Sequence, residues 1–419
     1  MSERKTIIPE FGPFAGMRVI SAGSIVAMPV AGTLLADFGA EVLHIERPGV
    51  GDTFRVLAPF VDDGDKKVSS SWAQQGRNRL SLSLELNLKK YPEVKELFFD
   101  LIREADIFME NLVWTEKLGI YDEELLEINP KLIIVHVSGY GNPKFGGVPE
   151  ICDRASYDMI GQAFSGWLSM QAKTNGEPAI AKPWTNDYIS VYQTLFGVLA
   201  AYINMLKTGK GQVVDIAQYE AMGVYQCDNF TTYAETGVMK PSTGNKSAAF
   251  QPYGMFKSKD GYDVVIGAFG PGVYNRSIQA MGFDLDYYTF KACASGVPAV
   301  SSDIGRELDQ KVIAWCAERT AQEIEDIMAA HKVPCSRVNT VKDCLENEHF
   351  IKRENFIKYE DQTLGREITA WGITPKLSGT PGKVWRGAPS VGQDTDAILT
   401  DILGYDEAKI QALKDKKLI

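Results

Sequence analysis

The stretch that decides the fold is "MRVISAGSIVAMPVAGTLLADFGAEVLHIE", residues 17–46. It begins with an apolar strand, "MRVISAG", continues with a helix, "PVAGTLLADFGA", and ends with a second strand, "EVLHIE". Pro29 stands in the first turn of the predicted helix, where a missing N–H costs little. A unit of this length is typical of a βαβ crossover, which predicts parallel strands joined by right-handed connections.

The alternation of strands and helices continues to about residue 150. "RLSLSLELN", "DIFMEN" and "KLIIVHVSGYG" are strand-like, and "EVKELFFDLIREA" is an amphipathic helix. We therefore expect a doubly wound, Rossmann-like α/β domain with a binding crevice at the carboxyl ends of its strands. The first turn, "SAGSIVAMP", lacks the GxGxxG pattern, so a dinucleotide is not indicated.

The rest of the chain predicts more helix and a second, smaller α+β unit. Residues 153–207 are mostly helical, with Gly209 just beyond their end, and "QVVDIAQYEAM" returns as strand then helix. "YGMFKSKDGYDVVIGAF" predicts a β-hairpin with Asp260 and Gly261 in its turn. Helices follow it, and a loop with two short helices ends the sequence.

Composition restricts the class of protein. The 419 residues are 45% hydrophobic and 23% charged, which is typical of a soluble protein of two or three domains. The net charge of −10 argues against nucleic acid and against an anionic membrane surface as partners. The start resembles no signal peptide, and no apolar stretch is expected to span a membrane, so we expect a cytoplasmic protein. The scattered cysteines and histidines predict free thiols and no metal site.

Asp187 is the first candidate for chemistry. It stands in "KPWTNDYISV", residues 182–191, just before a long apolar helical run. An aspartate in this position is usually an N-cap that accepts a backbone N–H. The positive end of the helix dipole would also keep a carboxylate ionised there, and a carboxylate can attack an activated carbonyl. The two roles are compatible, and both stay open from the local sequence.

Arg47 is the second candidate. It follows the second strand in "IERPGVGD", residues 45–52, which is either an ordinary turn or a place where an arginine binds a phosphate bidentately. Further polar side chains follow other strands, although single lysines are usually only solvated. An aromatic set is mostly expected in the core, but near Asp187 it could line an acyl pocket or stack on a quaternary ammonium. These polar and aromatic candidates are Asn87, Lys89, Asn111, Lys117, Tyr157, Trp167, Trp184, Tyr188 and Tyr192.

Several segments, taken in order along the chain, resemble class III CoA-transferases, the relatives of formyl-CoA, carnitine and bile-acid CoA-transferases. They are "GPFAGMRVISAGSIVAMPVAGTLLADFGAEVLHIERPGVGD", "ADIFMEN", "NPKLIIVHVSGYG", "RASYDMIGQAFSGWLSM", "TGKGQVVDIAQYEAM" and "WRGAPSVGQDTDAIL". The similarity is greatest to the carnitine and bile-acid branch, through "RASYDMIGQAFSG" and "WRGAPSVGQDT".

The resemblance implies a mechanism. The family's nucleophilic aspartate matches Asp187 in "TNDYIS". An acyl-aspartyl anhydride and then an aspartyl-CoA thioester would form on it, so that CoA moves between carboxylic acids with no ATP, no metal and no tightly bound cofactor. CoA thioesters and small carboxylic acids are the implied substrates, with a carnitine- or betaine-type acid, a bile acid or a short acid left open.

The resemblance also implies the binding residues. The CoA contacts are Arg47, Asn87, Lys89, Asn111, Lys117, Gly139 and Tyr140, and the substrate pocket is Tyr157, Trp184 and Tyr188. The chain departs from the family at Val26, often Gln, and at Val113, where the carnitine branch has lysine. It has only "TGNKSAAF" in place of a glycine run, so formate and oxalate are not expected as substrates.

The implied architecture is an interlocked homodimer. Residues 1–224 and 370–419 form a large CoA-binding domain from both chain ends, and 250–345 form the small domain. Linkers at 225–249 and 346–369 connect the two.

Two competing functions are disfavoured. Acyl-CoA racemases share the fold but use a histidine that aligns with Tyr157 here, and no histidine lies between His136 and His331. A non-catalytic CoA-binding protein is the other alternative.

Overall fold

The computed structural model describes residues 4–171, 177–240 and 242–419, which form two compact units. The large unit comprises Met1–Ser165, Lys182–Tyr225 and His349–Ile419. The small unit comprises Gly166–Ala181 and Gln226–Glu348.

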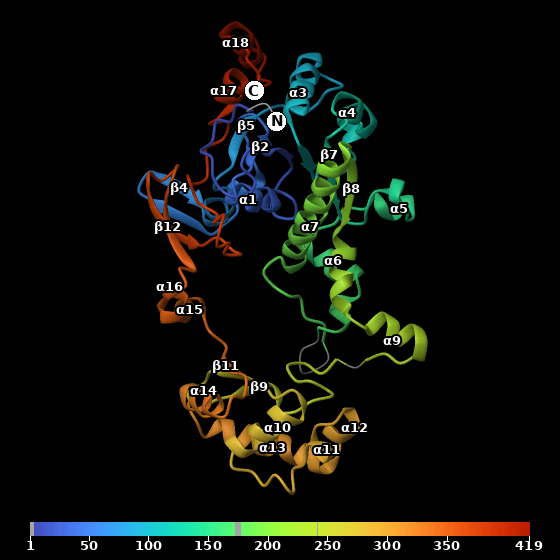
Figure 1. The fold of residues 1–419 in the computed structure, drawn as a ribbon, viewed down its shortest axis with the longest axis vertical. Coiled ribbons are helices and arrows are strands. Elements are labelled where there is room, and N and C mark those ends of the chain that lie inside the picture. The colour runs from blue at the N-terminus through green and yellow to red at the C-terminus, as the bar shows by residue number, and fades with distance from the viewer. Residues whose placement is uncertain (1–3, 172–176, 241) are drawn as a thin grey trace. The chain divides into compact units, whose positions relative to one another are not determined.

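A six-stranded parallel sheet is the centre of the large unit, as the βαβ pattern predicts (Figure 1). Its order is β5-β2-β1-β6-β7-β8, so the direction of strand addition reverses between β1 and β6. Ligands of open α/β sheets bind in the crevice beside this switch point. The strands are β1 (Arg18–Ala22), β2 (Glu41–Glu46), β5 (Leu80–Ser83), β6 (Ile107–Glu110), β7 (Ile133–Ser138) and β8 (Gln212–Ala217).

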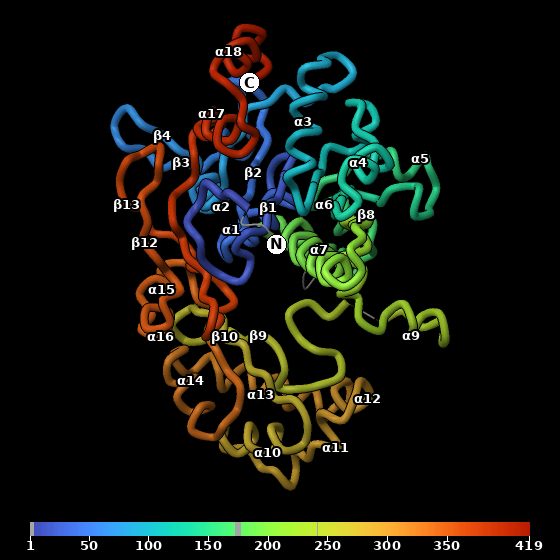
Figure 2. Tube along the Cα trace, turned by 45° about the horizontal axis from the view of Figure 1, so that its top comes forward, coloured from blue at the N-terminus to red at the C-terminus, as the bar shows by residue number. Residues whose placement is uncertain are grey.

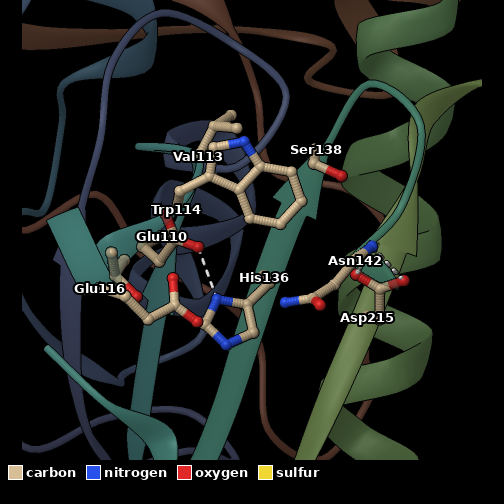
Figure 3. Close-up of a pocket in the computed structure, with 9 residues that line it drawn as sticks. Glu110, Val113, Trp114, Glu116, His136, Ser138, Asn142 and Asp215 are labelled. Atoms are coloured by element: carbon tan, nitrogen blue, oxygen red, sulfur yellow. Dashed lines mark hydrogen bonds and ion pairs between the residues drawn. The ribbon is translucent and has the colours of Figure 1, made fainter. Parts of the chain in front are cut away.

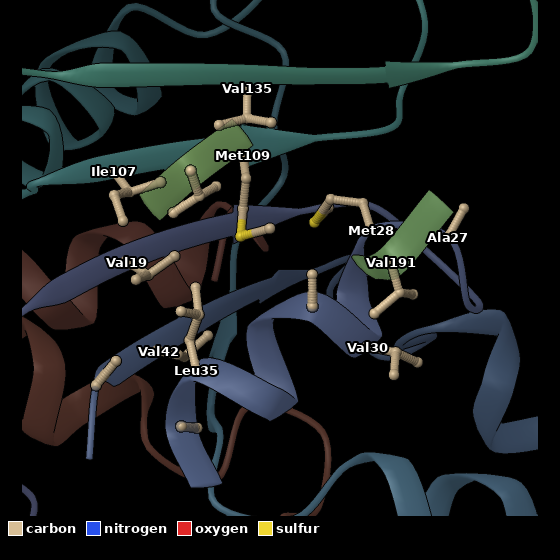
Figure 4. Close-up of a cluster of buried hydrophobic side chains, with 14 of the residues drawn as sticks. Val19, Ala27, Met28, Val30, Leu35, Val42, Ile107, Met109, Val135 and Val191 are labelled. Atoms are coloured by element: carbon tan, nitrogen blue, oxygen red, sulfur yellow. The ribbon is translucent and has the colours of Figure 1, made fainter. Parts of the chain in front are cut away.

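Each face of the sheet has its own apolar core, because successive side chains of a strand point to opposite faces. On one face Val19, Val42 and Ile107 pack with residues of α1 (Pro29–Asp37) and α7 (Thr185–Thr208), as Figure 4 shows. On the other face the neighbouring residues, such as Ile20 and Leu43, pack with α3 (Pro92–Glu104) and with the C-terminal segment. Pro29 is in the first turn of α1, as predicted.

Helix α7 corrects one expectation from the sequence. It has 24 residues, and an 18-residue window within it has a mean hydropathy of 1.4, so by length and composition alone it could cross a membrane. One side of it packs against α1, β7 and β8, with Val191, Val198 and Ala201 buried, whereas Phe196 and Ile203 are exposed. The helix ends as predicted, with Lys207 in its last turn and Gly209 as its left-handed cap.

The C-terminal segment packs on the first part of the large unit (Figure 1). The hydroxyl of Tyr359, in a strand pair, donates to the carbonyl of Ala73 at 2.8 Å, and Asp394 accepts the N–H of Ser81 at 2.8 Å. Residues 346–369, expected as a linker, contain a short helix and most of this strand pair. The elements are α16 (Glu348–Lys352), β12 (Phe356–Asp361), β13 (Arg366–Trp371), α17 (Thr395–Ala397) and α18 (Glu407–Asp415).

The small unit is built on a three-stranded antiparallel sheet of order β11-β10-β9. Figure 2 labels β9 and β10 of this sheet. The predicted hairpin is confirmed: β9 (Tyr253–Lys257) pairs with β10 (Asp263–Gly267), and Gly261 has φ +87° in the turn. Its main helices are α10 (Gly270–Ala280), α13 (Asp303–Ala317) and α14 (Ala321–Ala330), and β11 is Cys335–Arg337. Helix α9 (Asn229–Thr236) lies in the expected linker 225–249, of which residue 241 lies outside the described residues.

The remaining elements are short. In the large unit they are β3 (Phe60–Asp63), β4 (Lys66–Ser69), α2 (Ser70–Gln75), α4 (Asp122–Ile128), α5 (Pro149–Cys152), α6 (Asp158–Phe164) and α8 (Gln218–Gly223). In the small unit they are α11 (Phe290–Cys293), α12 (Val297–Val300) and α15 (Val341–Glu346).

Candidate active site

Asp187 lies in the first turn of α7, where α6 and α8 pack against this helix. Its side chain is buried, with 8% of the residue exposed. Three segments that are separate in the sequence therefore surround one carboxyl group.

The expected N-cap role of Asp187 is wrong. The cap position is occupied by Trp184, which makes no side-chain cap, and Asp187 lies inside the helix. The carboxylate of Asp158, from α6, accepts the backbone N–H groups of Asn186 at 2.7 Å and of Asp187 at 3.2 Å. Because a residue of another helix satisfies these N–H groups, the carboxylate of Asp187 is left for other contacts.

Gln218, the first residue of α8, makes the one hydrogen bond to the Asp187 carboxylate. Its Nε2 donates to Oδ1 at 2.6 Å, and in the described part of the chain no donor contacts Oδ2. Burial and the negative charge of Asp158 raise the pKa of Asp187 to about 7, against the opposing hydrogen bond from Gln218. The expectation that the helix start keeps Asp187 fully charged is thus wrong near neutral pH, because burial and a like charge outweigh the helix dipole.

A glycine on α6 allows this arrangement. A Cβ at Gly161 would lie 1.9 Å from Nδ2 of Asn186, whose side chain is fully buried. Only glycine therefore lets α6 approach the start of α7 closely enough for Asp158 to reach the backbone there.

The three aromatic residues predicted for the substrate pocket, Tyr157, Trp184 and Tyr188, all belong to the large unit. The hydroxyl of Tyr188 accepts a hydrogen bond from Gln75 Nε2 at 2.9 Å, and burial raises the pKa of that hydroxyl. The Trp184 ring meets Phe54 edge to face, with centroids 5.9 Å apart. Tyr157, next to Asp158, is 70% exposed. Trp167 belongs to the small unit, and Tyr192 is exposed on α7.

A cavity of about 260 Å³ lies at the carboxyl ends of β1, β2 and β5, where the switch-point rule places a ligand. Arg47 lines it and is exposed, and no carboxylate among the described residues pairs with its guanidinium. The other walls include Ser24, Gly51, Leu86, Leu112 and Leu118.

Asn111 shapes the wall of this cavity through its own hydrogen bonds. Its Oδ1 accepts the N–H of Ser24 and its Nδ2 donates to the carbonyl of Ser24, both at 3.0 Å. A Cβ at Gly23 would lie 1.9 Å from this Oδ1, so the turn after β1 requires glycine. Asn111 therefore holds the turn, and its amide has protein partners in this structure.

The other predicted CoA contacts are spread around the ends of β5, β6 and β7. Asn87 Oδ1 accepts the N–H of Lys90 at 3.1 Å. Lys89 and Lys117 are exposed, and Lys117 Nζ lies 3.8 Å from Asp153. A Cβ at Gly139 would lie 2.1 Å from that of Ser156, and the ring of Tyr140 packs edge to face on Phe164 with centroids 4.8 Å apart.

Asp52 is a residue that the sequence reasoning missed. Its Oδ1 accepts hydrogen bonds from Ser24 Oγ and the N–H of Ile25, both at 3.0 Å, and from the N–H of Phe54 at 2.8 Å. Its Oδ2 lies 3.1 Å from His44 Nε2. Burial opposes ionisation, but the contact with His44, the positive charge of Arg79 and the N–H of Phe54 outweigh it and lower the pKa of Asp52 to about 2. Asp52 is the last residue of "IERPGVGD", and its role was hidden because the first turn, which it contacts in space, lies almost thirty residues earlier in the sequence.

A second buried cluster, also missed, lies beside a small cavity at the ends of β6, β7 and β8 (Figure 3). His136 contacts Glu110 Oε1 through Nδ1 at 2.5 Å and Asp122 Oδ1 through Nε2 at 3.0 Å. Burial would lower the pKa of His136, but the two carboxylates raise it to about 10. The backbone N–H of Asn142 donates to both oxygens of Asp215 at 3.1 Å. Among the described residues, no group of His, Cys, Asp and Glu has the arrangement of a metal site.

A parallel sheet with a crevice at its switch point places the chain among α/β proteins that bind ligands at the carboxyl ends of their strands. The chain belongs to CoA-transferase family III, whose model matches residues 14–395. It is 36% identical over 417 residues to the bile acid CoA-transferase BaiK of Clostridium scindens, with 96% of this chain and 88% of that protein covered. It is therefore an enzyme of the CoA-transferase type, a class whose substrates are CoA thioesters.

Solved structures agree with the fold. A CAIB/BAIF family protein from Brucella suis superimposes with a TM-score of 0.78 at 22% identity, covering 94% of this chain and 100% of that chain. Rv3272 from Mycobacterium tuberculosis superimposes with a TM-score of 0.78 at 24% identity, covering 93% and 99%. The family expected from the sequence and the mixed α/β fold with a parallel sheet are confirmed.

Proposed function

We propose that this enzyme moves CoA between carboxylic acids through covalent intermediates on Asp187. The observation that carries the proposal is the state of this carboxyl group, which is buried, is bonded through Oδ1 alone among the described residues, and has its pKa raised to about 7. A group with such a pKa is ionised in a useful fraction at neutral pH and is a better nucleophile than an ordinary aspartate.

The reaction balances with no further reagent. Asp187 Oδ2 attacks the carbonyl carbon of the donor thioester, the C–S bond breaks and CoA leaves as thiolate. The thiolate attacks Cγ of the resulting anhydride, the Cγ–Oδ2 bond breaks, and the donor acid leaves with that oxygen. The acceptor carboxylate attacks the aspartyl-CoA thioester and expels the thiolate, which then attacks the acceptor's carbonyl carbon. Asp187 is released with one oxygen from the acceptor.

The cavity beside β1, β2 and β5 is the proposed site for CoA. Arg47 would bind a phosphate there, because its guanidinium is exposed at the cavity and carries no carboxylate partner in the described part of the chain. Asn111 and Asp52 would act indirectly, through the turn at Ser24. Further CoA contacts are proposed only from the resemblance to the family: Asn87, Lys89, Lys117, Gly139 and Tyr140.

The proposed acyl substrate is of the bile-acid type. The support is the similarity over nearly the whole chain to a relative named a bile acid CoA-transferase. Tyr157, Trp184 and Tyr188 are proposed to line the acyl pocket. A carnitine- or betaine-type acid is the second candidate, because Trp184 and Tyr188 neighbour Asp187 on α7 and aromatic faces bind quaternary ammonium groups.

A substrate panel tests both proposals. Cholyl-CoA and γ-butyrobetainyl-CoA would each be offered with cholate, deoxycholate, carnitine and a short 2-hydroxy acid, and the products separated by liquid chromatography. Acceptor acid carrying ¹⁸O in both carboxyl oxygens should place label in the Asp187 peptide after turnover. Turnover without any label in that peptide would refute the covalent route, whichever acid is accepted.

A homodimer is proposed from exposed apolar residues of the large unit. Tyr192, Phe196, Ile203 and Leu206 are 52–72% exposed and follow one face of α7. A second copy of the chain would cover this face. Analytical ultracentrifugation of the wild type should show a dimer, and the double variant Phe196→Glu with Ile203→Glu should shift it toward monomer. A monomeric wild type would contradict the proposal.

A further inference from the structure

The amide of Gln218 touches the atom of Asp187 that changes charge during the proposed reaction. Its Nε2 donates to Oδ1 at 2.6 Å, and Gln218 itself is 6% exposed. In the part of the chain that the structure describes, one oxygen of the carboxylate is bonded and the other has no donor, so the two oxygens have different surroundings before any substrate binds.

We infer that Gln218 is a catalytic residue that stabilises negative charge on Asp187 Oδ1 each time the carbonyl carbon of Asp187 is attacked. The inference rests on the proposed function. Attack by the CoA thiolate on Cγ of the anhydride moves the C=O electron pair onto Oδ1, and that pair returns when the donor acid leaves. Attack by the acceptor carboxylate on the aspartyl-CoA thioester does the same, and the pair returns when the thiolate leaves.

The position of the donor suits this role. Gln218 is held at the start of α8 directly after β8, so its amide comes from a rigid strand end instead of a loop. An N–H group already within hydrogen-bond distance of the oxygen needs no reorganisation when charge develops there. The charge on Asp158 disfavours negative charge on Asp187, which increases the need for such a donor.

Gln218 stabilises the developing charge directly in the two steps at Cγ, whereas it affects the first step only through the ionised fraction of Asp187, which its hydrogen bond favours. In the first step charge develops on the substrate's own carbonyl oxygen, while Oδ1 loses charge as the anhydride forms. Removal of the amide should therefore separate the two halves of the reaction, whereas a general loss of structure would slow both.

The variant Gln218→Leu tests this separation, with cholyl-CoA as probe and no acceptor acid. Rapid mixing with a thiol reagent measures release of CoA thiol, and mass spectrometry of the quenched protein measures formation of the aspartyl-CoA thioester. We expect thiol release within a few-fold of wild type and thioester formation slower by about 10²–10³-fold, the usual loss for one such donor. The variant should then hold one equivalent of free thiol that the wild type consumes.

Controls keep the outcomes distinct. Gln411→Leu removes an exposed glutamine of α18 that donates to the carboxylate of Asp415 at 2.7 Å, and should match wild type in both measurements. Gln218→Met replaces Gln218→Leu if circular dichroism shows that the latter is unfolded. Wild-type thioester formation in a folded Gln218 variant, or equal slowing of both steps, overturns the role of Gln218. No thioester on Asp187 in the wild type overturns the proposed function instead.

Discussion

Two buried carboxylates of the large unit, Asp52 and Asp187, have opposite properties. They are 3% and 8% exposed, yet the pKa of Asp52 is lowered to about 2 and the pKa of Asp187 is raised to about 7. Burial opposes ionisation of both, so burial alone does not decide the charge of either group.

The difference lies in the partners. Asp52 has contacts on both oxygens, including the imidazole of His44, and the cation Arg79 also lowers its pKa. Among the described residues, Asp187 has one donor, Gln218, and an anion, Asp158, as neighbour. A carboxylate whose hydrogen-bonding capacity is filled holds the fold together, whereas one left partly unbonded keeps reactivity that a substrate can use. The two groups should thus fail in opposite ways when changed.

Removal of the Asp187 carboxylate should have the largest effect on activity. We expect Asp187→Ala and Asp187→Asn to lower transfer by at least about 10⁴-fold, as for other enzymes that lose a covalent nucleophile. Titration calorimetry should show CoA binding close to that of wild type, because the proposed CoA cavity does not include Asp187. Turnover at the wild-type rate in Asp187→Ala would show that Asp187 is not the reactive carboxylate.

Asp52→Asn should damage the fold and spare the chemistry. The asparagine oxygen can still accept the backbone N–H groups of the first turn, but its amide nitrogen cannot accept a hydrogen bond from His44 Nε2 and the negative charge near Arg79 is lost. We therefore expect a loss of roughly 2–4 kcal/mol in the free energy of unfolding. Urea denaturation measures the loss. Asp62→Asn, at an exposed position of β3, is the control and should change stability by less than about 0.5 kcal/mol. If the two variants were equally stable, Asp52 would not be the structural carboxylate described above.

The pH dependence of stability should have opposite signs for the two groups. The pKa of Asp52 is depressed on folding, so its contribution is present above pH 4 and is lost as pH falls toward 2. The pKa of Asp187 rises on folding from 3.8 to about 7, so stability falls as pH rises through this window, by up to roughly 4 kcal/mol. Asp187→Asn should therefore gain stability relative to wild type between pH 4 and pH 7. A difference that stays constant across this range would show that Asp187 has an ordinary pKa.

The same groups predict the pH profile of activity. Transfer needs the ionised form of Asp187, so kcat/KM, which reports the free enzyme, should fall about tenfold per pH unit below a midpoint near 7. Asp158→Asn removes the neighbouring negative charge, while its side-chain oxygen can still accept the N–H groups of Asn186 and Asp187 once Gln162 reorients. The midpoint should move to lower pH in this variant. A midpoint equal to that of wild type would mean that Asp158 acts on structure alone.

Much of this fold could be predicted from the sequence, because it rests on local patterns. The βαβ unit, the strand ends and the cap at Gly209 follow from periodicity and from single residues. The contacts of Asp187 could not be predicted in this way. They come from Asp158 and Gln218, which lie about thirty residues away on either side, and the local rule for an aspartate before a helix favoured the wrong cap.

Asp52 and His136 were missed for the same reason. Each is inconspicuous in its own segment and acquires its role only when parallel strands place residues from separate crossovers together. The expectation that no apolar stretch could span a membrane failed for a different reason, because α7 is long and apolar enough by length and composition alone.

Of these variants, Arg47→Ala should have the smallest effect on activity. It should change the binding of CoA and leave the chemical steps unchanged. Arg47 lines the same cavity as the turn after β1 that Asp52 holds in place. Unlike Asp52, it is exposed and makes no ion pair in the described part of the chain. Its loss should therefore leave the free energy of unfolding unchanged. It should lower the affinity for CoA by about tenfold, the value of one charge-assisted contact in a site partly open to water. The KM for the CoA thioester should rise with kcat little changed, and the effect should shrink at high salt. Arg47→Lys, which keeps the charge but not the planar fork, should recover part of the affinity. If the affinity for CoA were unchanged in Arg47→Ala, the nucleotide would bind outside this cavity. Asp52, which holds the turn after β1, would then contribute to the fold and not to CoA binding.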